Sequence, residues 1–150
     1  MTDSSRPWIN IRSPTFLVAR ALAVCGRCRS STPVIAAAVP PGHETRDEDT
    51  WEIADHHALL FHIDYLSAAV IMRLQAQGAY RRDTHWINHC RSCGAPQDDL
   101  ELFCEPEGAF LPTSASSAAL IELLSVDEPL EAAAAGYAIE PQFLFTTRKE

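Results

Sequence analysis

The sequence predicts an α+β fold, built mostly of antiparallel β-hairpins around a four-cysteine metal site and carrying one inserted helix. Three observations lead to this prediction. The chain holds two Cys-x-x-Cys pairs, apolar residues alternate on either side of each pair, and a run with helical spacing lies between the pairs. A period of two is typical of strands and a period near 3.6 is typical of helices.

Length and composition indicate how the chain is organised. The chain has 150 residues, of which 47% are hydrophobic, and this is enough to bury one core without disulfides. We therefore expect residues 1–150 to form a single compact domain. No apolar run approaches the roughly 20 residues that span a bilayer, and the segment Met1–Trp8 lacks the apolar core of a signal peptide. We expect a cytoplasmic protein with no membrane partner.

The first hairpin is predicted at about residues 16–39. Alternate positions from Phe16 to Val24 are mostly apolar, which favours a strand that runs into the first Cys-x-x-Cys turn. The segment Pro33–Val39 returns as its partner strand. The second hairpin, at about residues 84–104, repeats this order. The segment Thr84–His89 leads into the second turn, and Asp98–Cys104, with its alternating leucines and cysteine, is predicted as the return strand.

A helical insertion is predicted between the hairpins, at about residues 55–78. Within it we favour a helix from Asp64, which suits an N-cap, to Gly78, which suits the position just past the C-terminus, after short strands at Trp51–Ile53 and Leu59–His62; a helix that begins at Asp55 is the alternative. The apolar residues of this run recur at helical spacing and predict one buried face; they are Ile63, Leu66, Val70 and Leu74. In the C-terminal segment 113–141, we favour strands at Ala119–Val126 and Leu130–Ile139. The alanines there also suit helix, so helix or strand stays open for residues 116–139.

The cysteine pairs carry the clearest chemistry. Two residues between thiolates let one short turn direct both sulfurs at a single ion, and two such turns supply the four soft ligands of a tetrahedral zinc site. The predicted zinc ligands are Cys25, Cys28, Cys90 and Cys93. Iron in the same site and a histidine in place of one cysteine, with His89 as the candidate, are alternatives. A redox dithiol is disfavoured because neither pair precedes a helix start.

The remaining cysteine bears on the redox state. The chain has five cysteines, an odd number, and it lacks an export signal, which favours reduced thiols over a disulfide framework. Cys104 is the residue left over. Because it alternates with two leucines, we expect it to pack in the core.

Two Cys-x-x-Cys turns at hairpin tips resemble a zinc ribbon. The segments Cys25–Val34 and Asn88–Gly94 are also similar to a loosely defined group of uncharacterised bacterial zinc-ribbon proteins. The resemblance covers the two hairpins and implies that the four paired cysteines bind zinc. The chain departs from the ribbon pattern in three ways. Sixty-one residues, 29 to 89, separate the pairs; Arg29 stands where a turn of this kind usually carries Gly; and neither turn has a Pro after its first cysteine.

The sequence favours a binding module over an enzyme. It contains no phosphate-cradling Gly-rich loop, nucleophile elbow or paired catalytic carboxylates, and we expect Asp98 and Asp99 to lie on a solvated strand edge. The predicted function is a non-enzymatic zinc module that binds a protein partner. The alternative is nucleic-acid binding through the arginines of the turns, namely Arg27, Arg29 and Arg91. A net charge of −8 disfavours this alternative because phosphate backbones repel an acidic chain. No feature indicates an oligomeric state.

Overall fold

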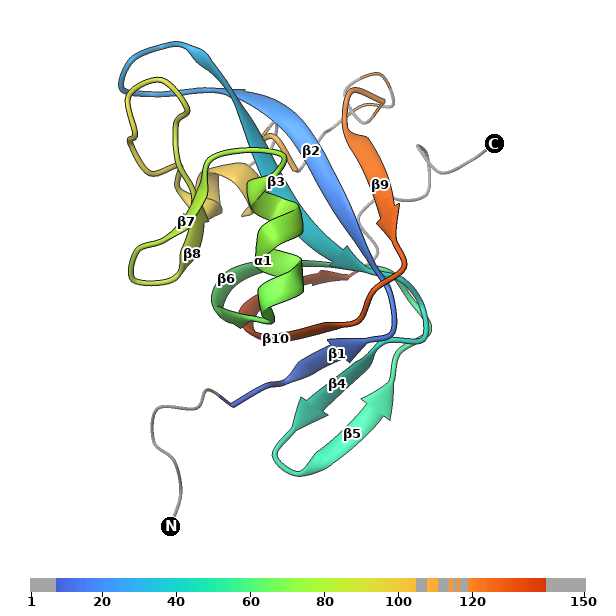
Figure 1. Cartoon of the computed structure of the whole chain (residues 1–150). Helices are drawn as coiled ribbons and strands as arrows, with labels where there is room; N and C mark the ends of the chain where they lie inside the picture. The colour runs from blue at the N-terminus through green and yellow to red at the C-terminus, as the bar shows by residue number, and fades with distance from the viewer. Residues whose placement is uncertain (1–7, 105–107, 111–113, 115, 117–118, 140–150) are drawn as a thin grey trace.

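A mostly antiparallel β-sheet dominates the computed structural model (Figure 1), which describes residues 8–104, 108–110, 114, 116 and 119–139. The described part contains one α-helix, α1 (Ala68–Gln75), and a short π-helix, η1 (Leu100–Cys104). Its strands are β1 (Ile11–Ser13), β2 (Phe16–Val24), β3 (Ser31–Val39), β4 (Glu44–Asp47), β5 (Thr50–Ile53), β6 (Ala58–Leu66), β7 (Tyr80–Arg82), β8 (Trp86–Asn88), β9 (Glu122–Val126) and β10 (Leu130–Ile139).

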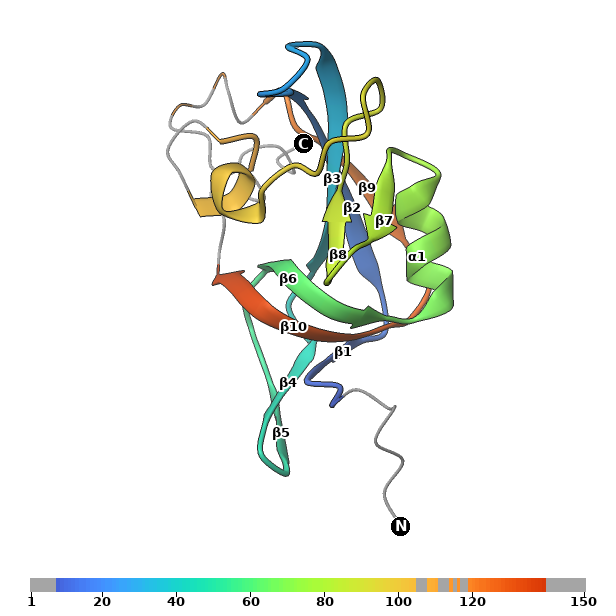
Figure 2. The ribbon, with the colours of Figure 1, turned by 90° about the vertical axis from the view of Figure 1, so that its left-hand side faces the viewer.

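The strand order places β3 near the middle of the sheet. The main path runs β5-β4-β1-β10-β6-β3-β2-β9, and β8 joins it from the side by pairing with β6 and β7. Each strand pair of the described part is antiparallel. From Thr32 to Val39 every residue of β3 is buried. Both faces of this strand are therefore covered, and Figure 2 shows α1 and β7 on one side of it and η1 on the other.

Two hydrophobic cores lie on opposite faces of the sheet. On β2, Phe16 and Val18 face the core beneath α1, whereas Leu17 and Ala19 face the core beneath η1. Neighbouring residues of a strand point to opposite faces, so a strand buried on both faces needs apolar residues at consecutive positions. The uninterrupted apolar run from Val34 to Val39 on β3 meets this need.

The predicted α+β class is wrong. The described residues form a mostly β structure with a sheet of ten strands, which is far larger than two zinc-ribbon hairpins. The two Cys-x-x-Cys turns lie together at one end of this sheet (Figure 1) rather than at its centre. The fold is organised by the two hydrophobic cores, and the two Cys-x-x-Cys turns lie at their margin.

Within the second hairpin, the return strand predicted at 98–104 is also wrong. The chain forms η1 there, with Leu102 and Phe103 both buried in the same core. Consecutive residues of a strand could not face one core, so the helical turn buries more apolar surface than a strand would. The side chain of Cys104 lies outside the described residues, so its predicted core packing is not addressed.

The helical insertion predicted at 55–78 is wrong in its extent. The helix begins at Ala68, with Ser67 as its N-cap residue, and ends at Gln75. Residues 58–66 instead form β6, whose backbone pairs with β10. The pairing with β10 satisfies the backbone N–H and C=O groups of these residues as a helix would. It also places Ile63 and Leu66 in the core beneath α1.

Several strand predictions are confirmed. The hairpin of residues 16–39 corresponds to β2 and β3, and the lead-in at Thr84–His89 contains β8. In the C-terminal segment, β9 and β10 occupy Glu122–Val126 and Leu130–Ile139, while parts of residues 113–141 lie outside the described residues. Within the described residues, no helix has the length and apolar character required to cross a bilayer.

Gly136 allows an aromatic ring to lie against the sheet. It pairs with Phe61 across β10 and β6, and a Cβ at this position would lie 2.3 Å from the Phe61 ring. That ring stacks on Phe103 at a centroid distance of 4.9 Å, and Phe103 stacks on Phe110 at 4.9 Å. Because Gly136 has no side chain, the Phe61 ring can lie against the sheet and stack in a row with Phe103 and Phe110.

We expect Gly136→Ala to destabilise the protein by about 1–3 kcal/mol, as overpacking of a dense core does. The added methyl group must displace the Phe61 ring from its stack on Phe103. Urea unfolding followed by circular dichroism measures the change. Gly26→Ala is the control, because a Cβ there meets no atom within 4 Å. Equal stability of the wild type and the Gly136 variant would contradict the packing argument.

Candidate metal centre

The two Cys-x-x-Cys turns share one backbone geometry. In the first turn, the N–H of Cys25 donates to the carbonyl of Ser30 at 2.9 Å, and the N–H of Arg29 donates to the carbonyl of Cys25 at 2.8 Å. In the second turn, the same two bonds join Cys90 to Ala95 and Gly94, at 2.7 and 2.9 Å. Residues four and five positions after the first cysteine therefore fold each turn back on itself, and this places both sulfurs on one side.

In each turn, the residue four positions after the first cysteine must adopt the left-handed backbone conformation, with a positive φ. Arg29 has φ of 66° and Gly94 has φ of 81°. Glycine adopts this conformation without steric cost, whereas a residue with a Cβ pays about 1–2 kcal/mol. Arg29, which the sequence marked as a departure from the ribbon pattern, therefore strains the first turn.

We expect Arg29→Gly to stabilise the protein by up to about 1 kcal/mol, since relief of the strain is partly offset by the greater entropy of the unfolded chain. Gly94→Ala is expected to destabilise by a similar amount, although its Cβ would meet no atom within 4 Å. Chemical denaturation of both variants with metal bound tests the pair. A loss of stability in Arg29→Gly would show that the arginine side chain contributes more than the strain costs.

The second turn is positioned by the open edge of β3. Strand β6 pairs with β3 only from Ala37 onward, which leaves the earlier residues of β3 without a strand on that side. The side-chain amide of Asn88 takes this place: it donates to the carbonyl of Ile35 and accepts from the N–H of Ile35, both at 2.9 Å. The N–H of Arg91 donates to Oγ1 of Thr32 at 2.9 Å. Asn88 and Thr32 are buried, and these three bonds bring the second turn beside the first.

The four sulfurs form a compact cluster. The Sγ atoms of Cys25 and Cys93 are 3.7 Å apart and those of Cys28 and Cys90 are 3.6 Å apart, and the four Sγ atoms all lie within 4.8 Å of one another. These separations exceed a disulfide bond, which is about 2.05 Å. Four sulfurs placed tetrahedrally at the usual zinc–sulfur distance of about 2.3 Å would be about 3.8 Å apart. The cluster therefore matches the geometry of a tetrahedral metal site.

Hydrogen bonds to sulfur favour the thiolate form. The N–H groups of Cys28 and Arg27 are directed at the sulfur of Cys25, at 3.4 Å from Arg27, and lower the pKa of Cys25 to about 6. The hydroxyl and N–H of Ser30 lower the pKa of Cys28. At Cys93 the N–H of Ala95 favours the thiolate, but burial and the three neighbouring sulfurs together raise its pKa to about 11.

This pattern explains what a cation would contribute. The lowered pKa values of Cys25 and Cys28 favour their thiolates, whereas the raised pKa of Cys93 retains its proton because a further negative charge is unfavourable so close to the others. A bound divalent cation removes that repulsion, and its binding releases the remaining protons. Four thiolates fill a tetrahedral shell and leave no position for water or substrate. The cluster could bind a metal ion in a structural role.

The other candidate residues occupy different places. His89 is buried, its Nδ1 lies 3.1 Å from the carbonyl oxygen of Ile87, and it is not part of the sulfur cluster. Arg27, Arg29 and Arg91 are exposed around the turns. Within the described residues, none of these arginine side chains forms an ion pair or a hydrogen bond. They therefore surround the metal centre as solvated cations.

Sequence reasoning missed the residues that support the centre. Gln97 is buried and its side chain donates to the sulfur of Cys25 at 3.6 Å and to the carbonyl of Ala95 at 3.0 Å. The roles of Thr32 and Asn88 could not be predicted from the sequence either, because their hydrogen-bond partners, Arg91 and Ile35, lie more than fifty residues away along the chain. The prediction for Asp99 was wrong: it is buried, with 7% of its surface exposed, rather than on a solvated edge. The one feature that marks these four residues is that they are polar and buried. Burial is known only from the structure, so the sequence alone could not identify them.

No protein-family model, curated protein or solved structure matches this chain. The functional argument therefore rests on the geometry of the cluster and its surroundings.

Proposed function

We propose that the chain is a non-enzymatic zinc module in which one zinc ion fastens the two turns, and that its exposed arginines bind an acidic surface of a protein partner. The zinc ligands are Cys25, Cys28, Cys90 and Cys93. The sulfur–sulfur separations of 3.6 and 3.7 Å carry the proposal, because they fit zinc–thiolate bonds of about 2.3 Å. Zinc is the commoner occupant of closed four-thiolate structural sites. Reduced thiols suit a cytoplasmic location.

Elemental analysis of the purified full chain after exhaustive dialysis tests the metal. One retained zinc per chain is expected. If one iron per chain were retained instead, the proposed module would bind iron rather than zinc. Free thiols without any transition metal would overturn the proposal.

The partner surface rests on charge and rigidity. Three exposed arginines lie on turns that the metal and the hydrogen bonds hold in one arrangement. The planar guanidinium of arginine forms paired hydrogen bonds with carboxylates, and the turns hold the backbone from which these groups extend. The chain as a whole is acidic, with a net charge of −8, so it opposes binding to phosphate backbones. An acidic protein surface that contacts only the two turns would meet the arginines and avoid the acidic rest of the chain. It therefore suits these arginines better than a nucleic acid does.

A variant that carries Arg27→Ala, Arg29→Gly and Arg91→Ala tests the surface. The glycine is chosen because it removes the charge and relieves the strained φ of this residue. We expect the wild type to bind an acidic model peptide, poly-glutamate, more tightly than the variant, and to bind duplex DNA and single-stranded RNA only weakly at about 0.15 M salt. Submicromolar binding to nucleic acid that the variant loses would favour the nucleic-acid alternative and overturn the protein-partner proposal.

A further inference from the structure

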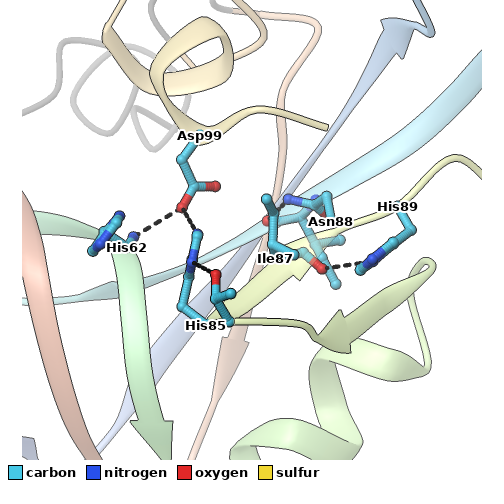
Figure 3. Close-up of polar contacts among 8 residues, drawn as sticks. His62, His85, Ile87, Asn88, His89 and Asp99 are labelled. Carbon is cyan, nitrogen blue, oxygen red and sulfur yellow. Dashed lines mark hydrogen bonds and ion pairs between the residues drawn. The ribbon is translucent and has the colours of Figure 1, made fainter. Parts of the chain in front are cut away.

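A second cluster of metal-binding side chains lies beside an open cleft, away from the four sulfurs. The cleft has a volume of about 460 Å³, and the polar residues along it include His62, Asp83, Thr84, His85, Asp98 and Asp99. Figure 3 shows His62, His85 and Asp99 close together, with Asp99 in contact with the backbone N–H of His62 and with the ring of His85, whereas His89 lies apart. The three side chains come from β6, from the residue before β8 and from the residue before η1, so three separate segments converge here.

Asp99 brings a buried carboxylate to this point. It is 7% exposed, and its Oδ2 accepts the backbone N–H of His62 at 3.0 Å. Nε2 of His85 lies 3.4 Å from the same oxygen. A buried carboxylate is costly unless cations or donors surround it. Here the surrounding groups are one N–H and two imidazoles, and these leave lone pairs of the carboxylate available toward the cleft.

His85 is held in the orientation of a metal ligand. Its Nδ1 lies 3.1 Å from Oγ1 of Thr84, while its Nε2 is buried and has no hydrogen-bond partner among the described residues. Metal-binding histidines usually hydrogen-bond through the nitrogen that does not bind the metal, which fixes the ring and directs the other nitrogen at the ion. The closest polar neighbour of Nε2 is Oδ2 of Asp99, at 3.4 Å, and a cation between this nitrogen and this oxygen would bind both.

His62 is placed by an irregularity in β6. The register with β10 shifts so that Tyr65 pairs with Ala133 but Ile63 pairs with Ala134, which leaves Asp64 as an extra residue. Two positions earlier, His62 has φ of 53°, a left-handed conformation that is uncommon for residues other than glycine. Bulges change the direction of nearby side chains. The His62 ring stacks on that of His85 at a centroid distance of 4.4 Å.

We propose that His62, His85 and Asp99 bind a second divalent transition-metal ion, with at least one coordination position open to the cleft. One ligand atom from each residue lies within 4.8 Å of the others. Ligands at about 2.0 Å from a tetrahedral zinc ion would be about 3.3 Å apart. The exposed ring of His62 can rotate inward to close this difference, while the two less exposed ligands stay in place.

The chemistry of the ligands sets the class of ion. Two imidazoles and one carboxylate suit Zn²⁺, Fe²⁺, Co²⁺ or Ni²⁺, whereas Mg²⁺ and Ca²⁺ prefer oxygen alone. Three protein ligands leave room for water or for an oxygen of a small ligand. The carboxylates of Asp83 and Asp98 also line the cleft and add a negative potential that attracts a cation. This site differs from the sulfur cluster, which is closed and strongly selects soft metals.

Cobalt titration of the full chain, with one equivalent of zinc already bound, distinguishes the two sites. One equivalent of Co²⁺ is expected to bind in addition to the zinc, with visible d–d absorption but without the thiolate-to-cobalt charge-transfer band that sulfur ligands give. His62→Ala and Asp99→Asn are each expected to weaken this binding at least about 100-fold, since loss of even an outer-shell partner costs 10–100-fold. Asp99→Asn retains an oxygen that can accept the N–H of His62, so the bulge should survive.

The zinc content and the thermal melt of each variant show whether it still folds. His56→Ala is the matched control, because this histidine lies outside the cluster. If the folded, zinc-loaded wild type bound no equivalent of Co²⁺, the proposal would be overturned. Binding that persists unchanged in both the His62 and Asp99 variants, or that falls equally in the His56 variant, would also overturn it and assign the binding to surface histidines in general.

Discussion

Cys90→Ser is expected to abolish metal binding and to lower the melting temperature by about 10 °C or more. Cys90 is 2% exposed and its sulfur lies 3.6 Å from that of Cys28, so serine would leave a poor ligand in the middle of the cluster. A metal bound at the four cysteines would join two turns that 61 residues, numbers 29 to 89, separate. Because the site does not exist in the unfolded chain, the free energy of metal binding adds to the free energy of folding. Calorimetry with metal analysis measures both effects.

Cys104→Ser is the control for this prediction, because it makes the same chemical change at the cysteine that belongs to neither Cys-x-x-Cys pair. It is expected to leave the zinc content unchanged and to alter the melting temperature far less. Treatment of the wild type with a strong chelator should reproduce the melt of Cys90→Ser. A similar fall in melting temperature for both serine variants, with zinc retained in both, would contradict the structural role of the metal.

Asn88→Leu is expected to lower the free energy of unfolding by about 2–6 kcal/mol. The leucine has a similar size but cannot bond the N–H and carbonyl of Ile35, and each buried backbone group left without a partner costs about 1–3 kcal/mol. The substitution also frees the second turn from β3. We therefore expect the metal affinity to fall on the order of tenfold, as it does when a supporting contact is lost. Denaturant unfolding and competition with a chromophoric chelator measure the two effects.

Asn10 offers a matched control. Its side chain makes the same pair of bonds to the backbone of Ala134, at 3.0 and 3.1 Å, but these bonds join a different part of the sheet. Asn10→Leu should therefore reduce stability while the metal affinity of the folded protein stays unchanged. If both variants lowered the metal affinity equally, the loss would reflect general loosening of the fold, and Asn88 would have no special role in placing the second turn.

The sequence predicted the parts of this structure that depend on local patterns. The four cysteines come together as their spacing indicated, because two residues between thiols constrain a turn without help from the rest of the chain. The hairpin of β2 and β3 was also predictable, since apolar residues run through both strands. Even the strain at Arg29 was visible as a residue that stood where glycine was expected.

The helix boundary failed for a reason that the structure reveals. Ile63 and Leu66 both face the core under α1, yet they are three positions apart, which in a regular strand would place them on opposite faces. The extra residue at Asp64 restores the facing of Leu66. A bulged strand therefore imitated helical spacing. The sheet size was missed because most pairs join distant segments, as β1 joins β10, and no local pattern records such partners.

The second cluster could not be found by motif either. His62, His85 and Asp99 follow no spacing rule, and they meet only because a bulge, a hairpin and a helical turn converge. Asp99 was expected on a solvated strand because its neighbours alternate in polarity. The chain instead forms η1 there, and the carboxylate is turned inward toward the histidines.

The open edge of β3 gives the metal a further role, in protection against aggregation. Residues 32–36 of this strand have no neighbouring strand beyond the one that β2 provides, and the second turn covers them through Asn88 and Arg91. An uncovered edge with apolar residues can recruit a strand from another molecule. Loss of the metal would release the second turn and expose this edge while much of the sheet is still formed. If the cysteines bind a metal as proposed, protein depleted of that metal is therefore expected to self-associate through β3 before it unfolds.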